Sequence, residues 1–273
     1  MTRVGYLGPP GTFSEEAVGR CPALAGAERH PYPTFADAYE AALRGEVDAA
    51  LLPVENSIEG SVGATLDLLV HRPGLRIRLE LVVPVEQHLL SRAGTRIEDV
   101  ERVLSHPQAL GQCADFLRLR LRGVPTEPTL STADAARRAA ELPRAAAIGG
   151  QGAAERYGLA VLASSIQDSA ENFTRFVLVG REDERPSGRD RTSIAFTLDR
   201  DRPGGLYEVI AEFATRRVNL ARIESRPTKT AVGHYVFFLD FEGHRADPEC
   251  ADALAGVRRR VHMLLVLGSY PRA

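Results

Sequence analysis

The feature that most constrains the fold is an alternation of short apolar runs with helical patterns over residues 1–180. Residues 49–54 are apolar throughout, as expected for a strand buried on both faces of a parallel sheet. Shorter runs of the same kind occur at 4–7, 103–104, 145–148 and 176–179. Helical patterns lie between them, with Thr34 as an expected N-cap and one long helix expected at about 109–121. Alternating strands and helices predict a doubly wound α/β fold.

An extended segment interrupts this alternation. Residues 75–85 are largely β-branched or leucine, with alternating charges at Arg76, Arg78 and Glu80. This segment could cross between two lobes, with the chain returning near Ser164. One continuous sheet fits the same periodicity, so the pattern alone leaves both arrangements open.

A second domain is expected after residues 181–191, which are charged, broken by Pro and Gly, and typical of a linker. The pattern that follows is strand 193–198, helix 203–215, strands 220–226 and 232–241, helix 248–260 and strand 263–267. This βαββαβ order is ferredoxin-like. We therefore expect a domain at 1–180 and another at 192–273. The first would divide into lobe I (about 1–80 and 164–180) and lobe II (about 81–163).

Composition narrows the classes of partner. The formal net charge of −2 gives no reason to expect a nucleic-acid or membrane partner. No apolar run has the length of a membrane span, and strand residues begin at Val4, which leaves no room for a signal peptide. Cys21, Cys113 and Cys250 are odd in number and widely spaced, which disfavours a disulfide framework or a metal site. We expect a cytoplasmic protein without a metal.

Polar side chains directly follow the apolar runs at 49–54 and 103–104, and a third polar segment directly precedes the run at 176–179. Residues 55–57 read Glu-Asn-Ser, residues 105–108 read Ser-His-Pro-Gln, and residues 171–175 read Glu-Asn-Phe-Thr-Arg. Because ligands of open α/β sheets bind at the carboxyl ends of strands, these segments predict a cleft that holds a polar, anionic small molecule.

Two charged residues of these segments have alternative interpretations. Glu55 could be a general acid or base if burial raises its pKa, with Asn56 binding a carboxylate, or Glu55 could be solvated beside a capped turn. Arg175 can grip a carboxylate bidentately, or it could pair with Glu171.

Two helix starts are further candidates. Residues 8–14 could bind an anion through backbone amides, or form a tight turn with Thr12 or Ser14 as the cap. At residues 105–107, a helix start with proline in its first turn explains the sequence without catalysis by His106. Gln108 and Gln112 would share one face of that helix.

From Gly5 to Arg181 these motifs resemble the prephenate dehydratases. The resemblance implies a two-lobed fold like that of periplasmic binding proteins, with the substrate between the lobes. It implies catalysis by Thr174 and Glu55. The implied substrate-binding residues are Thr12, Ser14, Asn56, Ser57, Ser105, Gln112, Asn172, Arg175 and Phe176.

Beyond Arg191 the chain resembles the ACT regulatory domain. Residues 202–206 (Arg-Pro-Gly-Gly-Leu) and 224–227 (Glu-Ser-Arg-Pro) resemble the two phenylalanine-site motifs of these domains. The family usually has alanine where this chain has Gly205, a difference that bears on effector affinity. The implied effector residues are Gly204, Gly205, Leu206, Asn219, Leu220, Glu224, Ser225, Arg226 and Pro227.

The resemblance implies decarboxylation and dehydration of prephenate without a cofactor, L-phenylalanine as allosteric inhibitor, and a homodimer or homotetramer. Arogenate dehydratase and a non-catalytic amino-acid sensor are the alternatives. Thr174, Glu55 or water could supply the proton, and the role of His106 stays open.

Overall fold

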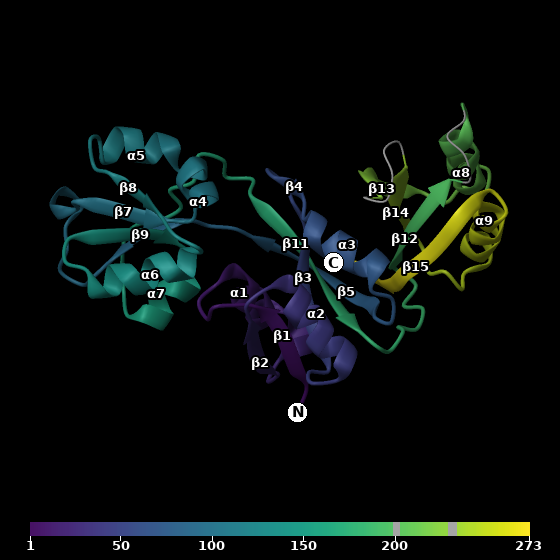
Figure 1. Ribbon diagram of the computed structural model, residues 1–273, viewed down its shortest axis with the longest axis horizontal. Coiled ribbons are helices and arrows are strands. Elements are labelled where there is room, and N and C mark those ends of the chain that lie inside the picture. Colours follow the sequence, from purple (N-terminus) through teal and green to yellow (C-terminus); the bar gives the residue numbers. More distant parts are fainter. Residues whose placement is uncertain (199–202, 229–233) are drawn as a thin grey trace. The chain divides into compact units, whose positions relative to one another are not determined.

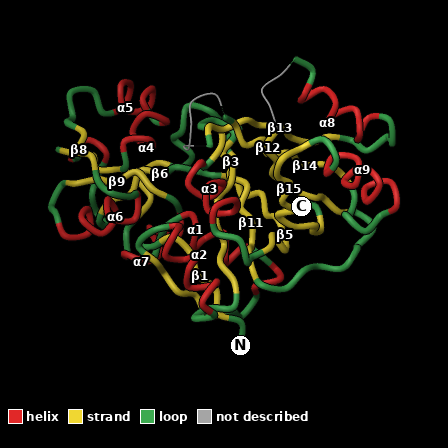
Figure 2. Tube along the Cα trace, turned by 45° about the vertical axis from the view of Figure 1, so that its right-hand side comes forward, coloured by secondary structure: helices red, strands yellow, loops and turns green. Residues whose placement is uncertain are grey.

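The computed structural model describes residues 1–198, 203–228 and 234–273. The chain divides into two compact units. The first unit comprises residues 1–63 and 81–176, and the second comprises residues 64–80 and 177–273. Each unit is described by itself below (Figures 1 and 2).

Lobe I is built on the sheet β2-β1-β3-β11-β5, with β4 paired to β3; of β5 and β11, residues 81–84 and 173–176 belong to the first unit. Its strands are β1 (Arg3–Leu7), β2 (Glu28–Tyr32), β3 (Ala49–Asn56), β4 (Gly60–Ser61), β5 (Arg76–Pro84) and β11 (Phe173–Gly180). Its helices are α1 (Phe13–Arg20), the 3-10 turn η1 (Pro22–Leu24) and α2 (Phe35–Arg44). The predicted cap of α2 is confirmed, because Thr34 Oγ1 accepts from the Asp37 N–H at 3.1 Å.

Lobe II, residues 88–163, has a sheet of its own in the order β10-β6-β9-β7-β8. Its strands are β6 (His88–Ser91), β7 (Arg102–Ser105), β8 (Thr126–Pro128), β9 (Ala145–Gly149) and β10 (Ala160–Ala163). Its helices are η2 (Ile97–Asp99), α4 (Pro107–Gln112), α5 (Ala114–Arg120), α6 (Thr132–Glu141) and α7 (Gln151–Tyr157).

Helices cover both faces of the lobe II sheet, with α4 and α5 on one side and α6 and α7 on the other (Figure 1). Alternation along the strands explains this. Ala146 and Ile148 of β9 pack in the core with α4 and α5, whereas Ala145 and Ala147 pack with α6 and α7. A strand that is apolar at every position therefore contributes side chains to two hydrophobic cores, one on each face of the sheet.

The two lobes are joined by residues 85–87 and 164–172, so the predicted two-lobed α/β architecture is confirmed. The crossing lies just after β5, which itself ends in lobe I at Pro84. The helix predicted at 109–121 is wrong in one respect. Cys113 leaves helical geometry (φ −119°, ψ 21°) and separates α4 from α5.

The C-terminal part of the second unit has the predicted βαββαβ order. It consists of β12 (Asp190–Leu198), α8 (Gly205–Ala214), β13 (Leu220–Pro227), β14 (Tyr235–Glu242), α9 (Pro248–Arg258) and β15 (Val261–Pro271). The antiparallel sheet runs β13-β14-β12-β15, with α8 and α9 on one face (Figure 1). Phe196, Phe213 and Phe241 are fully buried between sheet and helices.

Helix α8 begins later than predicted. Gly204 takes a left-handed conformation (φ 85°) that cannot continue a right-handed helix, so Pro203 lies outside α8. Residues 232–233 of the predicted strand, and Arg202 of the predicted effector motif, lie outside the described residues.

The second unit also contains α3 (Gly63–His71) from Ala64 onward and the start of β5. The alternating charges of β5 are paired within this unit. Arg78 Nε lies 2.7 Å from Glu184 Oε1, and Glu80 Oε2 lies 2.6 Å from Arg191 Nη1. The Glu80 side chain is only 2% exposed, so this second pair is largely removed from water.

Among the helices that the structure describes, none is both long and apolar enough to span a membrane.

Candidate active site

A cavity of about 420 Å³ lies in the first unit and is lined by both lobes and by the segments that join them. Its polar lining residues are Thr12, Ser14, Asn56, Gln87, His106, Gln108, Gln112, Ser131, Thr132, Asn172 and Thr174. Several predicted site residues thus meet here: Thr12, Ser14, Asn56, Gln112, Asn172, Thr174 and Phe176.

Asn56 makes the hydroxyl oxygen of Thr174 a hydrogen-bond acceptor. Its Oδ1 accepts from the N–H groups of Ile58 and Glu59, each at 3.0 Å, which places its Nδ2 on the opposite side. Nδ2 donates to Thr174 Oγ1 at 3.0 Å and to Asn172 Oδ1 at 2.8 Å. Because an amide nitrogen can only donate, Thr174 Oγ1 is the acceptor and keeps its own hydrogen for another acceptor.

The same amide chain continues into lobe II. Asn172 is 1% exposed, and its Nδ2 donates to Gln112 Oε1 at 3.2 Å. Asn56 in lobe I, Asn172 in the joining segment and Gln112 in lobe II therefore form one line of hydrogen bonds along the cavity.

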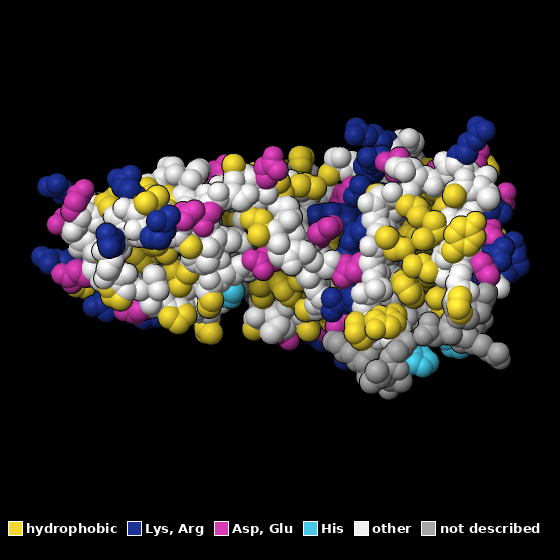
Figure 3. Space-filling view, turned by 90° about the horizontal axis from the view of Figure 1, so that it is seen from above, with side chains coloured by type: hydrophobic (Ala, Val, Ile, Leu, Met, Phe, Trp, Pro, Cys, Tyr) yellow, Lys and Arg dark blue, Asp and Glu magenta, His cyan; other side chains and the backbone are white. Residues whose placement is uncertain are grey.

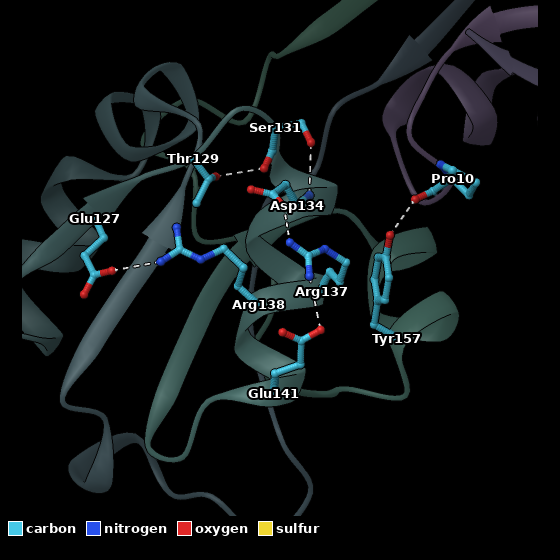
Figure 4. A network of polar contacts seen from close by, with 9 residues as sticks. All are labelled: Pro10, Glu127, Thr129, Ser131, Asp134, Arg137, Arg138, Glu141 and Tyr157. Carbon is cyan, nitrogen blue, oxygen red and sulfur yellow. Dashed lines mark hydrogen bonds and ion pairs between the residues drawn. The ribbon is translucent and has the colours of Figure 1, made fainter. Parts of the chain in front are cut away.

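Two helices begin at the cavity wall. Thr12 caps α1, with Oγ1 accepting from the Glu15 N–H at 3.5 Å, and Ser131 caps α6, with Oγ accepting from the Asp134 N–H at 3.0 Å. The Thr129 hydroxyl donates to the Ser131 carbonyl and fixes the turn before α6 (Figure 4). The positive ends of both helix dipoles therefore lie beside the cavity, where they favour a bound anion.

Glu55 and Arg175 are not among the residues that line the cavity. Strand alternation explains this, because Thr174 and Phe176 face the cavity and Arg175 between them points to the other face of β11. Arg175 Nη1 lies 3.8 Å from Glu55 Oε2. The structure thus brings these two predicted residues together, apart from the others.

Ser57 and Ser105 also lie outside the lining. The Ser57 hydroxyl donates to the Glu171 carbonyl and accepts from the Phe173 N–H, each at 2.9 Å, so it ties β3 to the start of β11. The fully buried Ser105 hydroxyl donates to the Ile148 carbonyl at 2.7 Å.

His106 lines the cavity and caps α4, with Pro107 in the first turn as predicted. Its Nδ1 accepts from the Gln108 N–H at 3.3 Å, which places the hydrogen of the neutral ring on Nε2. Cys113 is fully buried, and burial together with nearby Asp168 raises the pKa of its thiol to about 12. A thiol with that pKa is not a nucleophile at neutral pH.

Sequence reasoning missed Gln87, Ser131 and Thr132 as site residues, and it left Gln108 without a role. Gln87 is 3% exposed, and within the described structure its Oε1 is buried without a hydrogen-bond partner. Gln87 could have been recognised as a site residue because it is a polar residue shortly after the strand that leads out of lobe I. Ser131 could have been recognised from the turn that begins at Thr129 and leads into a helix.

The cavity combines apolar side chains with uncharged polar groups and His106. Within the described parts of the chain, its lining contains no Asp, Glu, Lys or Arg. Electrostatic attraction for an anion therefore comes from helix N-termini and from neutral N–H and O–H donors.

The predicted effector residues belong to the start of α8 and to β13 in the second unit. Leu206 and Leu220 pack against the hydrophobic core of the C-terminal sheet. Glu224 pairs with Arg222 and lies 3.6 Å from Arg226 Nη1, and the Asn219 carbonyl accepts from the Glu242 N–H. No group of three or more His, Cys, Asp or Glu side chains placed to hold a metal occurs among the described residues.

The chain matches the family model for prephenate dehydratase over residues 4–184 and that for the ACT domain over residues 192–259. The prephenate dehydratase of Amycolatopsis methanolica is 42% identical over 276 residues, which span 100% of this chain and 90% of that protein.

Two solved structures are similar over nearly the full chain. The Arthrobacter aurescens prephenate dehydratase in complex with L-Phe is 41% identical with a TM-score of 0.92, covering 100% of this chain and 90% of that one. A protein described as "GqqA- a novel type of quorum quenching acylases" is 30% identical with a TM-score of 0.89, covering 99% and 98%.

The fold, the cavity and these relatives define an enzyme of the hydro-lyase class with a C-terminal regulatory module. The chain belongs to the prephenate dehydratase family and carries an ACT domain.

Proposed function

We propose that this enzyme converts prephenate to phenylpyruvate, carbon dioxide and water. Prephenate is a dianion with a ring hydroxyl. The bond between the ring and its carboxylate breaks, its electron pair enters the ring, and the hydroxyl leaves with one proton as water. The product ring is aromatic, so the substrate itself supplies the thermodynamic drive.

The observation that carries this proposal is the orientation of the Thr174 hydroxyl in an uncharged cavity. Asn56 fixes it as an acceptor, so its hydrogen is available to the leaving hydroxyl of the substrate. A donor that is fixed in place before the reaction stabilises developing charge at little reorganisation cost. Thr174 is the proposed catalytic residue, with water as the source of the net proton.

The two helix N-termini support binding of the carboxylates. Backbone N–H groups at the starts of α1 and α6, with Thr12, Ser14 and Thr132, surround the cavity. Gln108, Gln112 and His106 supply further donors. We retain Glu55 and Arg175 as a proposed pair that supports the site from the other face of the sheet, since they lie 3.8 Å apart.

The charge of the cavity favours prephenate over arogenate. Arogenate differs by an ammonium group, which is best bound by a carboxylate, and the described lining residues include no Asp or Glu. Helix N-termini also disfavour a cation. We therefore expect kcat/KM to be higher with prephenate.

The test is the formation of phenylpyruvate from prephenate and, separately, of phenylalanine from arogenate, by purified protein without added cofactor. Prephenate turnover with weaker arogenate turnover is expected. Inactivity on both would leave the amino-acid sensor or the acylase activity named for GqqA, and an acylase substrate offered to the same preparation separates these two.

We further propose that L-phenylalanine inhibits the enzyme through the C-terminal domain of 192–273, joined to the catalytic domain of 1–180 by residues 181–191. The L-Phe complex of the Arthrobacter relative supports this. Asn219→Ala changes an exposed residue of the proposed effector site and should weaken inhibition without altering uninhibited kinetics. Inhibition that is unchanged in this variant, or uninhibited kinetics that change with it, counts against the assignment.

Pairing of two C-terminal domains is part of the same proposal. Strand β13 is an edge strand, and open edges tend to pair. Figure 3 shows hydrophobic side chains gathered over the part of the chain that holds β13, β14 and α8. Tyr207 of α8, Ile223 of β13 and Tyr235 of β14 are 74%, 45% and 45% exposed. Light scattering should report at least a dimer, and a monomer at micromolar concentration would refute this part.

We also propose a cytoplasmic location, which cell fractionation tests.

A further inference from the structure

The loop that leads into α1, residues 8–14, contacts lobe II although it belongs to lobe I. The Tyr157 hydroxyl at the end of α7 donates to the Pro10 carbonyl at 3.0 Å. Figure 4 shows the Tyr157 ring reaching from lobe II to Pro10. This bond joins two segments that are 147 positions apart in the sequence.

Close packing accompanies that hydrogen bond. A Cβ added to Gly11 (φ +92°) would lie 3.3 Å from Tyr157 Cε2 and 3.4 Å from Ala153 Cα, so the loop rests directly on α7. A Cβ added to Gly150 would lie 2.9 Å from Phe13 Cε1, which is closer than real Cβ atoms approach. Glycine at both positions therefore permits contact between the lobes that a side chain would obstruct.

The same loop forms one wall of the cavity. Thr12, Phe13 and Ser14 line it, and α1 begins there with Thr12 as its cap. Within lobe I the loop is held by Glu15, whose Oε2 accepts from the Gly11 N–H at 2.6 Å and whose Oε1 accepts from the Tyr6 hydroxyl at 3.1 Å. Tyr157 supplies a polar contact that holds this wall from the side of lobe II.

We infer that Tyr157 is a positioning residue that latches the α1 loop of lobe I against lobe II and so holds the substrate cavity in its closed form. The inference rests on the proposed function for its kinetic consequence, but the latch itself does not depend on which substrate binds. When the lobes separate, the Tyr157 to Pro10 bond must break and Gly11 must leave the tyrosine ring.

The expected effect follows from a population shift. The affinity of a ligand that needs the closed form is proportional to the fraction of protein in that form. Removing one neutral hydrogen bond from the closed form lowers the ratio of closed to open protein by about twofold to tenfold, and KM should rise by up to the same factor. The closed complex still contains Thr174 and Asn56, so kcat should change by less than about twofold.

Tyr157→Phe is the test, because it removes only the hydroxyl and keeps the ring against Gly11. Tyr32→Phe, on the outer strand β2 of lobe I, controls for loss of a tyrosine hydroxyl. Four quantities are measured for each variant: KM and kcat with prephenate, the thermal midpoint, and amide hydrogen exchange of peptides covering residues 8–14 and 151–157.

A raised KM with kcat retained, and faster exchange in both peptides of Tyr157→Phe only, is the expected result. Unchanged KM, unchanged exchange, or a lowered thermal midpoint with normal KM would each overturn the latch and leave Tyr157 a structural residue. If wild-type protein does not turn over prephenate, the proposed function fails, and the exchange measurement still decides the latch.

Discussion

The replacement Thr174→Val tests the central step of the proposed reaction. Valine has nearly the shape of threonine, so the change removes the hydroxyl and leaves the volume of the strand. Asn56 Nδ2 loses one acceptor but keeps Asn172 Oδ1 at 2.8 Å and the Phe173 carbonyl at 3.1 Å. The amide chain should therefore persist, and the cavity should keep its shape.

The magnitude distinguishes a catalytic hydroxyl from a binding one. A hydroxyl that donates to the leaving group in the transition state contributes about 10²- to 10⁴-fold to kcat. This corresponds to about 3 to 5 kcal/mol of activation free energy. A hydroxyl that only binds substrate contributes about 0.5 to 1.5 kcal/mol, and its loss would appear in KM. We expect the larger loss, in kcat, with KM changed by less than about threefold.

The assay is steady-state formation of phenylpyruvate by wild type, Thr174→Val and Thr174→Ser. Serine keeps the hydroxyl and should recover a large part of the lost rate. Thr65→Val is the matched control, since Thr65 is a buried threonine that lies on α3 outside the cavity. A Thr174→Val enzyme with kcat within threefold of wild type would show that the hydroxyl is not the donor.

Three further results are expected from the structure. Glu80→Gln should lower the free energy of unfolding by about 2 to 4 kcal/mol, because it leaves the charge of Arg191 in a largely buried site. Glu101→Gln, the control, changes an exposed ion pair and should lower the free energy of unfolding by less than about 1 kcal/mol. Equal losses in urea unfolding would contradict this. Thr65→Val should raise that free energy by up to about 1 kcal/mol, since within the described structure Thr65 Oγ1 is buried without a partner; destabilisation would show an overlooked bond. The Cys113 thiol, whose pKa burial raises to about 12, should react with iodoacetamide at pH 8 only after unfolding, as mass spectrometry can show.

Several buried elements were readable from the sequence, but the strand β6, which is buried at every position, was not predicted. Strand β9 is apolar at four consecutive positions because two cores use it, and that pattern was recognised. Strand β2 was missed because Glu28–Tyr32 is largely exposed and contains Pro31, so it has neither an apolar run nor alternation. Pairing with β1 supplies its stability, and pairing between distant segments leaves no local signal.

The candidate site was predictable by segment but not by side chain. Residues 171–175 were recognised as one polar segment, yet strand alternation places Arg175 on the face of β11 opposite to the one that Thr174 and Phe176 share. Whether the odd-numbered or the even-numbered residues of β11 face the cavity depends on how the sheet is folded, and the sequence of the strand does not determine it. Ser131 lies in a turn whose sequence is typical of any N-cap, and its nearness to residue 12 depends on how the two lobes meet.

Contacts between the lobes connect closure to the proposed chemistry. At one place Tyr157 holds the loop that begins α1, and at another Asn172 donates to Gln112 of lobe II at 3.2 Å. Asn172 also accepts from the Asn56 amide that fixes the Thr174 hydroxyl. If lobe II moves away, Asn172 loses a partner and the line of amides that orients Thr174 is no longer anchored at its far end. On the proposed mechanism the hydroxyl is therefore best aligned when both lobes enclose the substrate, which favours reaction in the closed form.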